Sequence, residues 1–182
     1  MRLRRGERVL AAALETNRFT RFLVQHVGRV LMGACLATTA CAPENAATGH
    51  IEPTGDLFIS PEFSAEQQEV LIGAIAAWRD ATQAEVDLRV QIGSGSPQLR
   101  PSAERDGVFG EFIPSSRPEI LIDTQKAADP RALRNLTLHE IGHALGIGHI
   151  PRANSIMFPY ATTLQELDPW TLDAWRSLHD VR

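Results

Sequence analysis

The stretch HEIGHALGIGH, residues 139–149, constrains how the rest of the chain must fold. It places three of the chain's six histidines and one glutamate within eleven positions. Residues four apart share one face of a helix, so the imidazoles of His139 and His143 would point at the same place. Two neutral imidazoles on one face form a partial site for a zinc ion.

The other three residues of interest in this stretch extend the partial site. Glu140 follows His139 by a step of about 100° around a helix, which sets its carboxylate beside the metal position. That placement suits a general base acting on an activated water. Gly146 can adopt the left-handed conformation that ends a helix. The turn would bring His149 back as a third ligand and leave a fourth position open, as in catalytic zinc sites.

With Met157, the pattern HExxHxxGxxH resembles the signature of the metzincin metallopeptidases. The step from His149 to Met157 and the following Pro159–Tyr160 pair are most similar to the matrixin branch. The resemblance implies that Met157 forms a Met-turn, a tight turn beneath the metal. It also implies that Pro159 and Tyr160 line the substrate pocket that lies beyond the scissile bond. Two other roles for Tyr160 stay open, namely assistance to the oxyanion or a buried structural position.

Two further stretches extend the resemblance to the matrixin branch. GVFGEFIP (107–114) resembles its edge strand, which implies main-chain pairing with an extended substrate and places Phe109 and Gly110 at the pocket. TLDAWRSL (171–178) resembles its last helix. The implied fold is α+β, a metzincin-like catalytic domain with a mixed, twisted sheet of about four to five strands. Three helices complete it, and the Met-turn follows the active-site helix.

The resemblance also bears on metal content, because the chain departs from the family there. Glu111 and Leu121 stand where two histidines of the matrixin structural zinc would be, and the loop 94–107 holds no histidine. We therefore expect one catalytic zinc and no structural zinc. Calcium bound through Asp123 stays open, since an aspartate that ends a strand is usually a turn residue.

Hydrophobic periodicity and turn signals predict the order of elements along the chain. Ser64 and Gln67 form a capping box at the start of a strongly amphipathic stretch. Asp129 and Pro130 begin another predicted helix, which carries the histidines. Helices are expected at 64–83, 129–145 and 168–180, strands at 56–60, 85–93, 108–113 and 119–123, and an irregular loop at 94–107.

Composition limits the classes of partner. The chain has 182 residues, of which 43% are hydrophobic and 22% charged, as in a globular protein with one domain. Residues 42–182 carry 11 Lys and Arg against 20 Asp and Glu, a net charge of −9. An acidic region of this kind is a poor partner for nucleic acid or for an anionic membrane.

The N-terminal region is predicted to be an export signal or a lipoprotein-type leader, spanning residues 1–41. It holds seven arginines and the apolar run VLMGACLATTA (30–40), which is too short to span a bilayer. Cys41 resembles the lipidated cysteine of bacterial lipoproteins, although Thr38 stands where leucine is usual. The alternative is an arginine-rich leader with no role in export.

The predicted organisation is a leader, a flexible tether at 42–55 and a catalytic domain at 56–182. We expect the protein to be exported to the cell envelope or beyond, with membrane attachment only through a lipidated Cys41. His50 and His179 are expected to be solvated rather than to bind metal.

These observations predict a zinc-dependent endopeptidase that acts as a monomer on proteins or peptides, with Glu140 as its general base. The alternative from another class is a non-catalytic, zinc-stabilised peptide-binding module at the cell surface. An amidase of the deformylase kind shares HExxH but needs a cysteine ligand. Both cysteines of this chain, Cys35 and Cys41, lie in the predicted leader.

Overall fold

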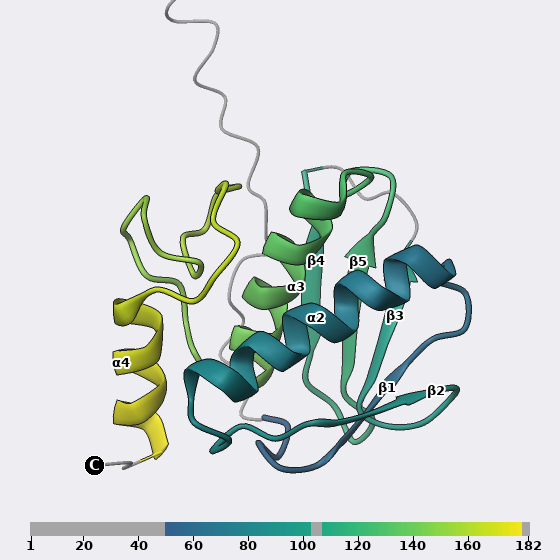
Figure 1. Cartoon of the computed structure of the whole chain (residues 1–182), viewed down its shortest axis with the longest axis horizontal. Helices are drawn as coiled ribbons and strands as arrows, with labels where there is room; N and C mark the ends of the chain where they lie inside the picture. The colour runs from purple at the N-terminus through teal and green to yellow at the C-terminus, as the bar shows by residue number, and fades with distance from the viewer. Residues whose placement is uncertain (1–49, 103–106, 180–182) are drawn as a thin grey trace, which may run out of the picture. The chain divides into compact units, whose positions relative to one another are not determined.

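A computed structural model describes residues 50–102 and 107–179, which form three helices and a five-stranded sheet (Figure 1). The predicted leader, and the predicted tether up to residue 49, lie outside the described residues. No helix in the described ranges is long and apolar enough to cross a membrane. The elements in chain order are β1 (Asp56–Ile59), α2 (Ala65–Ala81), β2 (Arg89–Ile92), β3 (Gln98–Ser102), β4 (Gly110–Ile113), β5 (Glu119–Asp123), α3 (Pro130–Ala144) and α4 (Pro169–His179).

The sheet is mixed, with strand order β2-β1-β3-β5-β4. Strand β1 pairs in parallel with both β2 and β3, and β3 pairs in parallel with β5. Strand β4 lies at an edge and runs antiparallel to β5. The expected α+β class, the mixed sheet and the three helices are confirmed.

Strand β3 corrects our prediction, because it lies within the stretch 94–107 that we expected to be an irregular loop. Only Leu99 is fully buried in it, so the stretch lacks the apolar alternation that marks a strand. Pro101 also argues against a central strand, because proline has no N–H to donate. The proline is accommodated because β1 pairs with β3 only as far as Leu99, while β5 pairs along all of β3.

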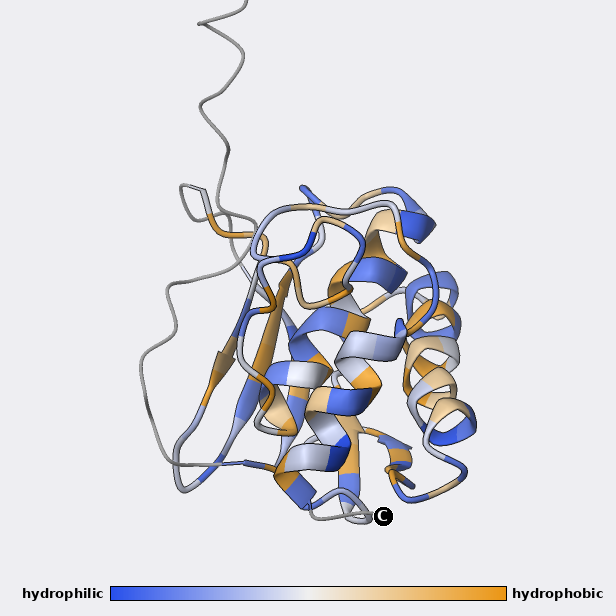
Figure 2. Cartoon of the chain, turned by 90° about the vertical axis from the view of Figure 1, so that its left-hand side faces the viewer, coloured by the Kyte–Doolittle hydropathy of each residue, from blue (hydrophilic) through white to orange (hydrophobic). Residues whose placement is uncertain are grey.

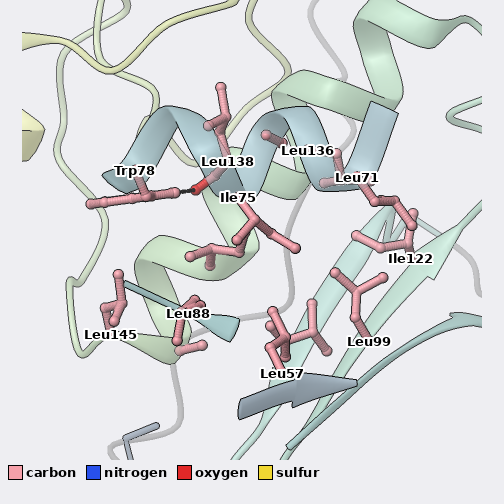
Figure 3. Close-up of a cluster of buried hydrophobic side chains, with 14 of the residues drawn as sticks. Leu57, Leu71, Ile75, Trp78, Leu88, Leu99, Ile122, Leu136, Leu138 and Leu145 are labelled. Atoms are coloured by element: carbon pink, nitrogen blue, oxygen red, sulfur yellow. Dashed lines mark hydrogen bonds between the residues drawn. The ribbon is translucent and has the colours of Figure 1, made fainter. Parts of the chain in front are cut away.

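The core lies between one face of the sheet and the helices α2 and α3 (Figures 1 and 2). Figure 3 shows the apolar side chains that meet there, with Trp78 reaching from α2 to the backbone of α3. Each such side chain contributes about 1.5–3 kcal/mol by leaving water. The labelled members are Leu57, Leu99 and Ile122 from the sheet, Leu71, Ile75 and Trp78 from α2, Leu136 and Leu138 from α3, and Leu88 and Leu145 from connecting segments.

Helix α2 starts where the sequence predicted. The Ser64 side chain accepts the Gln67 N–H at 3.2 Å, and the Gln67 side chain accepts the Ser64 N–H at 2.9 Å. This reciprocal capping box satisfies two N–H groups that the helix itself leaves without partners.

The segment before β1 does not behave as a tether along its whole predicted length. Ile51 is buried, and its N–H donates to the carbonyl of Ala144 at 2.8 Å. The prediction of a flexible tether reaching residue 55 is therefore wrong for its last few residues. A single apolar residue without periodic neighbours does not reveal such docking in the sequence.

Helix α4 is tied to the end of α3 by His179, which we expected to be solvated. Its Nε2 lies 3.2 Å from the carbonyl oxygen of Leu145, and its ring stacks on Trp175 with centroids 4.9 Å apart. A carbonyl only accepts, so the ring nitrogen donates. His179 is therefore half-buried rather than fully solvated, because the tertiary fold brings these helix ends together, and it lies outside the group of possible metal ligands in the described residues.

Replacing Trp78 by phenylalanine should lower the free energy of unfolding by about 2 kcal/mol, to be measured by urea denaturation. The change removes the indole N–H bond to the Leu138 carbonyl, 3.2 Å long, and leaves a small void in the core. Trp170→Phe is the matched control, since that side chain is 36% exposed and its replacement should cost about 0.5 kcal/mol or less. Equal costs for the two variants would contradict the assignment.

Candidate metal centre

Helix α3 carries two of the predicted metal ligands in its last two turns. Its start follows the sequence prediction, with the Asp129 carboxylate accepting the N–H groups of Arg131 at 2.7 Å and Ala132 at 3.3 Å. His139 is buried in this helix, and His143 is half-buried.

The helix ends in a turn that Gly146 makes possible. Gly146 has φ +94°, and its N–H donates to the His143 carbonyl at 2.9 Å. The N–H of Ile147 donates to the Gly142 carbonyl, also at 2.9 Å. These two bonds form a Schellman motif, in which glycine is favoured because it tolerates the left-handed conformation. The predicted role of Gly146 as the residue that ends the helix is therefore confirmed by its backbone.

The three predicted histidine ligands converge. Nε2 of His143 lies 3.0 Å from Nε2 of His139 and 3.2 Å from Nε2 of His149. One ligand atom from each residue lies within 4.8 Å of the others, and no other such group of three occurs in the described part of the chain. Tetrahedral zinc with bonds of about 2.0–2.1 Å needs ligand nitrogens roughly 3.3 Å apart. The donor set therefore fits one zinc ion.

Two of the rings are oriented by backbone carbonyls. Nδ1 of His139 lies 2.7 Å from the Ile156 oxygen, and Nδ1 of His143 lies 2.8 Å from the Ile147 oxygen. Because a carbonyl only accepts, each Nδ1 carries the proton and each Nε2 presents its lone pair to the common point. Neither Ile156 nor Ile147 could be identified from the sequence as an orienting residue, because the groups involved are backbone carbonyls.

His139 is neutral in this environment. Burial, and to a smaller extent the neighbouring His143, lower the pKa of His139 to about 3. The hydrogen bond to the Ile156 carbonyl opposes this shift, and His149 adds to it. A neutral imidazole is the form that binds a metal ion, so the ring needs no deprotonation near neutral pH.

Glu140 is fully buried and lies against the start of the edge strand β4. A Cβ added to Gly110 would stand 2.5 Å from Oε1 of Glu140, closer than real atoms approach. Gly110 is thus required by the carboxylate beside it. This contact joins the predicted general base to the predicted substrate-pairing strand, which the sequence separates by thirty positions.

Met157 packs against Gly142 of α3, the helix that carries the first two ligands. A Cβ at Gly142 would overlap the Met157 sulfur, so the glycine makes room for the methionine. The Met157 carbonyl accepts the Ile150 N–H at 2.9 Å, which closes the segment between His149 and the turn. Met157 is fully buried.

The predicted pocket residues lie in different surroundings. Tyr160 is 40% exposed, and its ring meets Phe158 with centroids 5.3 Å apart, so a buried structural position for Tyr160 is wrong. Pro159 and Phe109 are half-buried, and the carbonyl of Phe109 accepts the Asp123 N–H at 2.8 Å. The lining of a substrate pocket by these residues stays a prediction.

The segment after Tyr160 is held on α3 by Asn135 and Arg134, neither of which the sequence marked as functional. The Asn135 amide donates to the Thr162 hydroxyl at 2.8 Å and to the Leu164 carbonyl at 2.7 Å. Arg134 donates through Nε to the Gln165 carbonyl at 2.9 Å. An asparagine buried in a helix was the available signal, since such a side chain needs partners.

Asp123, a possible calcium ligand by sequence, is paired with the ammonium group of Lys126. Its buried carboxylate lies 3.3 Å from the Lys126 ammonium, which also donates to the Val108 carbonyl at 3.1 Å. The ammonium lies 5.7 Å from the centre of the Phe109 ring. Glu111 and Leu121 stand where two histidines of the matrixin structural zinc would be. They are paired with each other across β4 and β5.

The sequence profile of the matrixin family matches residues 77–173, more than half of the chain. No curated protein matches the sequence.

Two solved structures are similar to the chain. Archaemetzincin from Methanopyrus kandleri has 11% sequence identity and a TM-score of 0.48, over 75% of this chain and 99% of that one. Metalloproteinase-II from Bacteroides fragilis has 11% identity and a TM-score of 0.50, over 82% of this chain and 59% of that one. The chain thus spans less than two thirds of the second protein, and that likeness concerns the fold alone.

Gly146→Ala should destabilise the fold by about 1–2 kcal/mol, because a Cβ is strained at φ +94°. It should also weaken zinc binding, since His149 follows three residues after the turn. Zinc titration against a chelator and urea denaturation measure the two effects. Gly107→Ala is the control, with φ +74° and no neighbouring atom within 4 Å of the added Cβ. Equal losses of zinc affinity would show that the turn has no special role.

Proposed function

The chain belongs to the matrixin family, and from this membership we propose that it is a zinc-dependent endopeptidase that cleaves internal peptide bonds of proteins or peptides. The observation that carries the proposal is the fully buried Glu140 carboxylate, which follows the ligand His139 on α3 and lies against Gly110 at the start of β4. A purely structural metal site has no need of a buried carboxylate beside it, and burying one is costly.

His139, His143 and His149 would hold the metal ion, with a fourth position left for substrate or water. When bound, zinc supplies the positive charge that activates a water and polarises the peptide carbonyl. The protein itself would direct the three Nε2 lone pairs toward one metal position. The Ile156 and Ile147 carbonyls support this role, because they orient the rings of His139 and His143.

Glu140 is proposed as the general base. Its carboxylate would take a proton from the attacking water and later pass that proton to the leaving amine. The position between α3 and β4 supports this role, because a substrate lying along the strand would present its carbonyl beside the carboxylate. Gly110 leaves the space in which the carboxylate stands.

Substrate is proposed to bind as an added strand along the edge of β4 (Gly110–Ile113) that lies away from β5. Main-chain hydrogen bonds would supply affinity in this arrangement, and side-chain pockets would supply preference. Pro159 and Tyr160 are proposed to wall the pocket beyond the cut bond, with Phe109 on the strand side. The exposure of Tyr160 is compatible with such contact.

Localisation and metal content complete the proposal. The arginine-rich start and the apolar run at 30–40 support export, with Cys41 as the only proposed point of lipid attachment. One zinc is proposed per chain, which we expect to act as a monomer. We propose that the fold does not need calcium at Asp123, because the Lys126 ammonium already supplies a positive charge to that carboxylate.

Glu140→Gln should retain one zinc per chain and lower cleavage of a mixed peptide library by about 10²–10⁴-fold, because the amide cannot take up a proton. Metal analysis and mass spectrometry of the peptides measure the two quantities. Unchanged cleavage by the variant would rule out Glu140 as the base. If the parent binds zinc and cleaves nothing, the peptide-binding module becomes the better account.

Gly110→Ala should lower kcat by about 10–100-fold with little change in zinc affinity, because the new Cβ displaces the Glu140 carboxylate rather than a metal ligand. Steady-state kinetics on a cleaved peptide measures this effect. Gly73→Ala is the matched control, since its Cβ would meet only the end of the Arg134 side chain at 3.4 Å. Full activity in the Gly110 variant would show that the contact does not position the base.

A further inference from the structure

We propose that Asp168 is a positioning residue for the metal centre, acting through the backbone of Ile156 on the ligand His139. Asp168 lies immediately before α4, twenty-nine positions after His139 in the chain. The inference rests on the proposed zinc site. It adds a buried carboxylate outside the signature sequence to the groups that decide how tightly this chain holds its metal.

Ile156 is fixed from both sides. Its N–H donates to Oδ2 of Asp168 at 2.7 Å, and its carbonyl accepts Nδ1 of His139 at 2.7 Å. These groups belong to the two successive amide units that flank the Ile156 Cα. The carboxylate therefore acts by fixing where the Ile156 backbone lies, and this position decides the orientation of the His139 ring.

A series of side-chain hydrogen bonds also leads from the Met-turn to the carboxylate. Met157 donates its N–H to the Ser155 hydroxyl at 3.2 Å, and the Ser155 and Thr171 hydroxyl oxygens lie 3.0 Å apart. Thr171 donates its hydroxyl to Oδ2 of Asp168 at 2.7 Å. Since each hydroxyl has one proton, Ser155 must donate to Thr171. The chain of donors from the Met-turn thus ends on a group that only accepts when ionised.

The whole arrangement is shielded from water. Ser155 and Thr171 are fully buried, and Asp168 is 8% exposed. A buried carboxylate is tolerated only when hydrogen bonds compensate for its lost hydration. Oδ1 of Asp168 accepts the Thr171 N–H at 3.0 Å, so the carboxylate receives three donors in all. Hydrogen bonds to an ionised acceptor are stronger than those between neutral groups.

A simpler account is that Asp168 only caps α4. The Thr171 N–H bond is the usual contact of a capping residue with the third residue of its helix. Capping does not require the bond from Ile156, which comes from a different segment of the chain. The two roles use different oxygens and can be separated by a shorter side chain that caps and cannot reach Ile156.

Asp168→Ser in the full-length chain separates the two roles. Serine is as good a capping residue as aspartate, so α4 should persist, while the bond to the Ile156 N–H is lost. We expect zinc to bind about 10-fold more weakly in a chelator competition, within the range for groups that orient metal ligands. Asp173→Asn is the matched control on the same helix, since its exposed carboxylate pairs only with Arg176 in the described structure, and it should leave the zinc affinity unchanged.

Asp168→Asn is the second variant, which keeps the size of the side chain. All three partners of the carboxylate donate to it, so an amide must set its own N–H against a donor. Zinc affinity should fall in this variant as well. A zinc affinity within twofold of the parent in either folded variant overturns the proposal.

A nitrogen-detected NMR spectrum of the histidines in the metal-free protein gives a readout independent of catalysis. The parent should show His139 with its proton on Nδ1, and Asp168→Ser should show a mixture of the two tautomers. An unchanged His139 signal in the variant overturns the proposal. Failure of the parent chain to bind zinc would instead count against the proposed function, so the two ideas fail in different ways.

Discussion

The rest of the site depends on one constraint, the gathering of three imidazole nitrogens in which Nε2 of His143 lies 3.0 Å from that of His139 and 3.2 Å from that of His149. Such an arrangement has no attraction of its own in the absence of a cation, and it must be held by the surrounding protein. Two backbone carbonyls hold two of the rings from behind, and burial keeps His139 neutral. The metal-binding geometry is therefore prepared by the fold.

The scaffold divides this task between regular and irregular parts. Helix α3 is packed on the sheet and on α2, so it provides a rigid base for His139, Glu140 and His143 (Figures 1 and 3). The third ligand comes from an irregular segment, which is fastened at several points. The segment begins at the Schellman turn, and the Ile150 N–H bond to the Met157 carbonyl joins its two ends. The Asp168 carboxylate accepts the Ile156 N–H within it. Irregular backbone can be positioned well when its polar groups have partners.

The sequence predicted the group of three histidines and a good part of the fold. The HExxH spacing and Gly146 implied a helix that ends in a turn, and both are present. Strand β3 escaped because one buried leucine and a proline do not resemble a strand. The burial of Ile51 was not predicted for a related reason, since an isolated apolar residue forms no periodic pattern in the sequence. Both features are formed by pairing with distant segments, which local patterns do not record.

The sequence by itself determined the chemistry of the site: three nitrogen donors, one carboxylate and a glycine at fixed spacing, which depend only on helix geometry and on the conformational freedom of glycine. Only the tertiary structure decided which groups support that chemistry. Each of these supporting contacts joins segments far apart in the chain. They are the contact of Gly110 with Glu140, the hydrogen bond of His139 to the Ile156 carbonyl, and the hydrogen bond of the Ile156 N–H to Asp168. The physical reason is that hydrogen bonds and close contacts depend on distance in space, and packing of the core sets that distance.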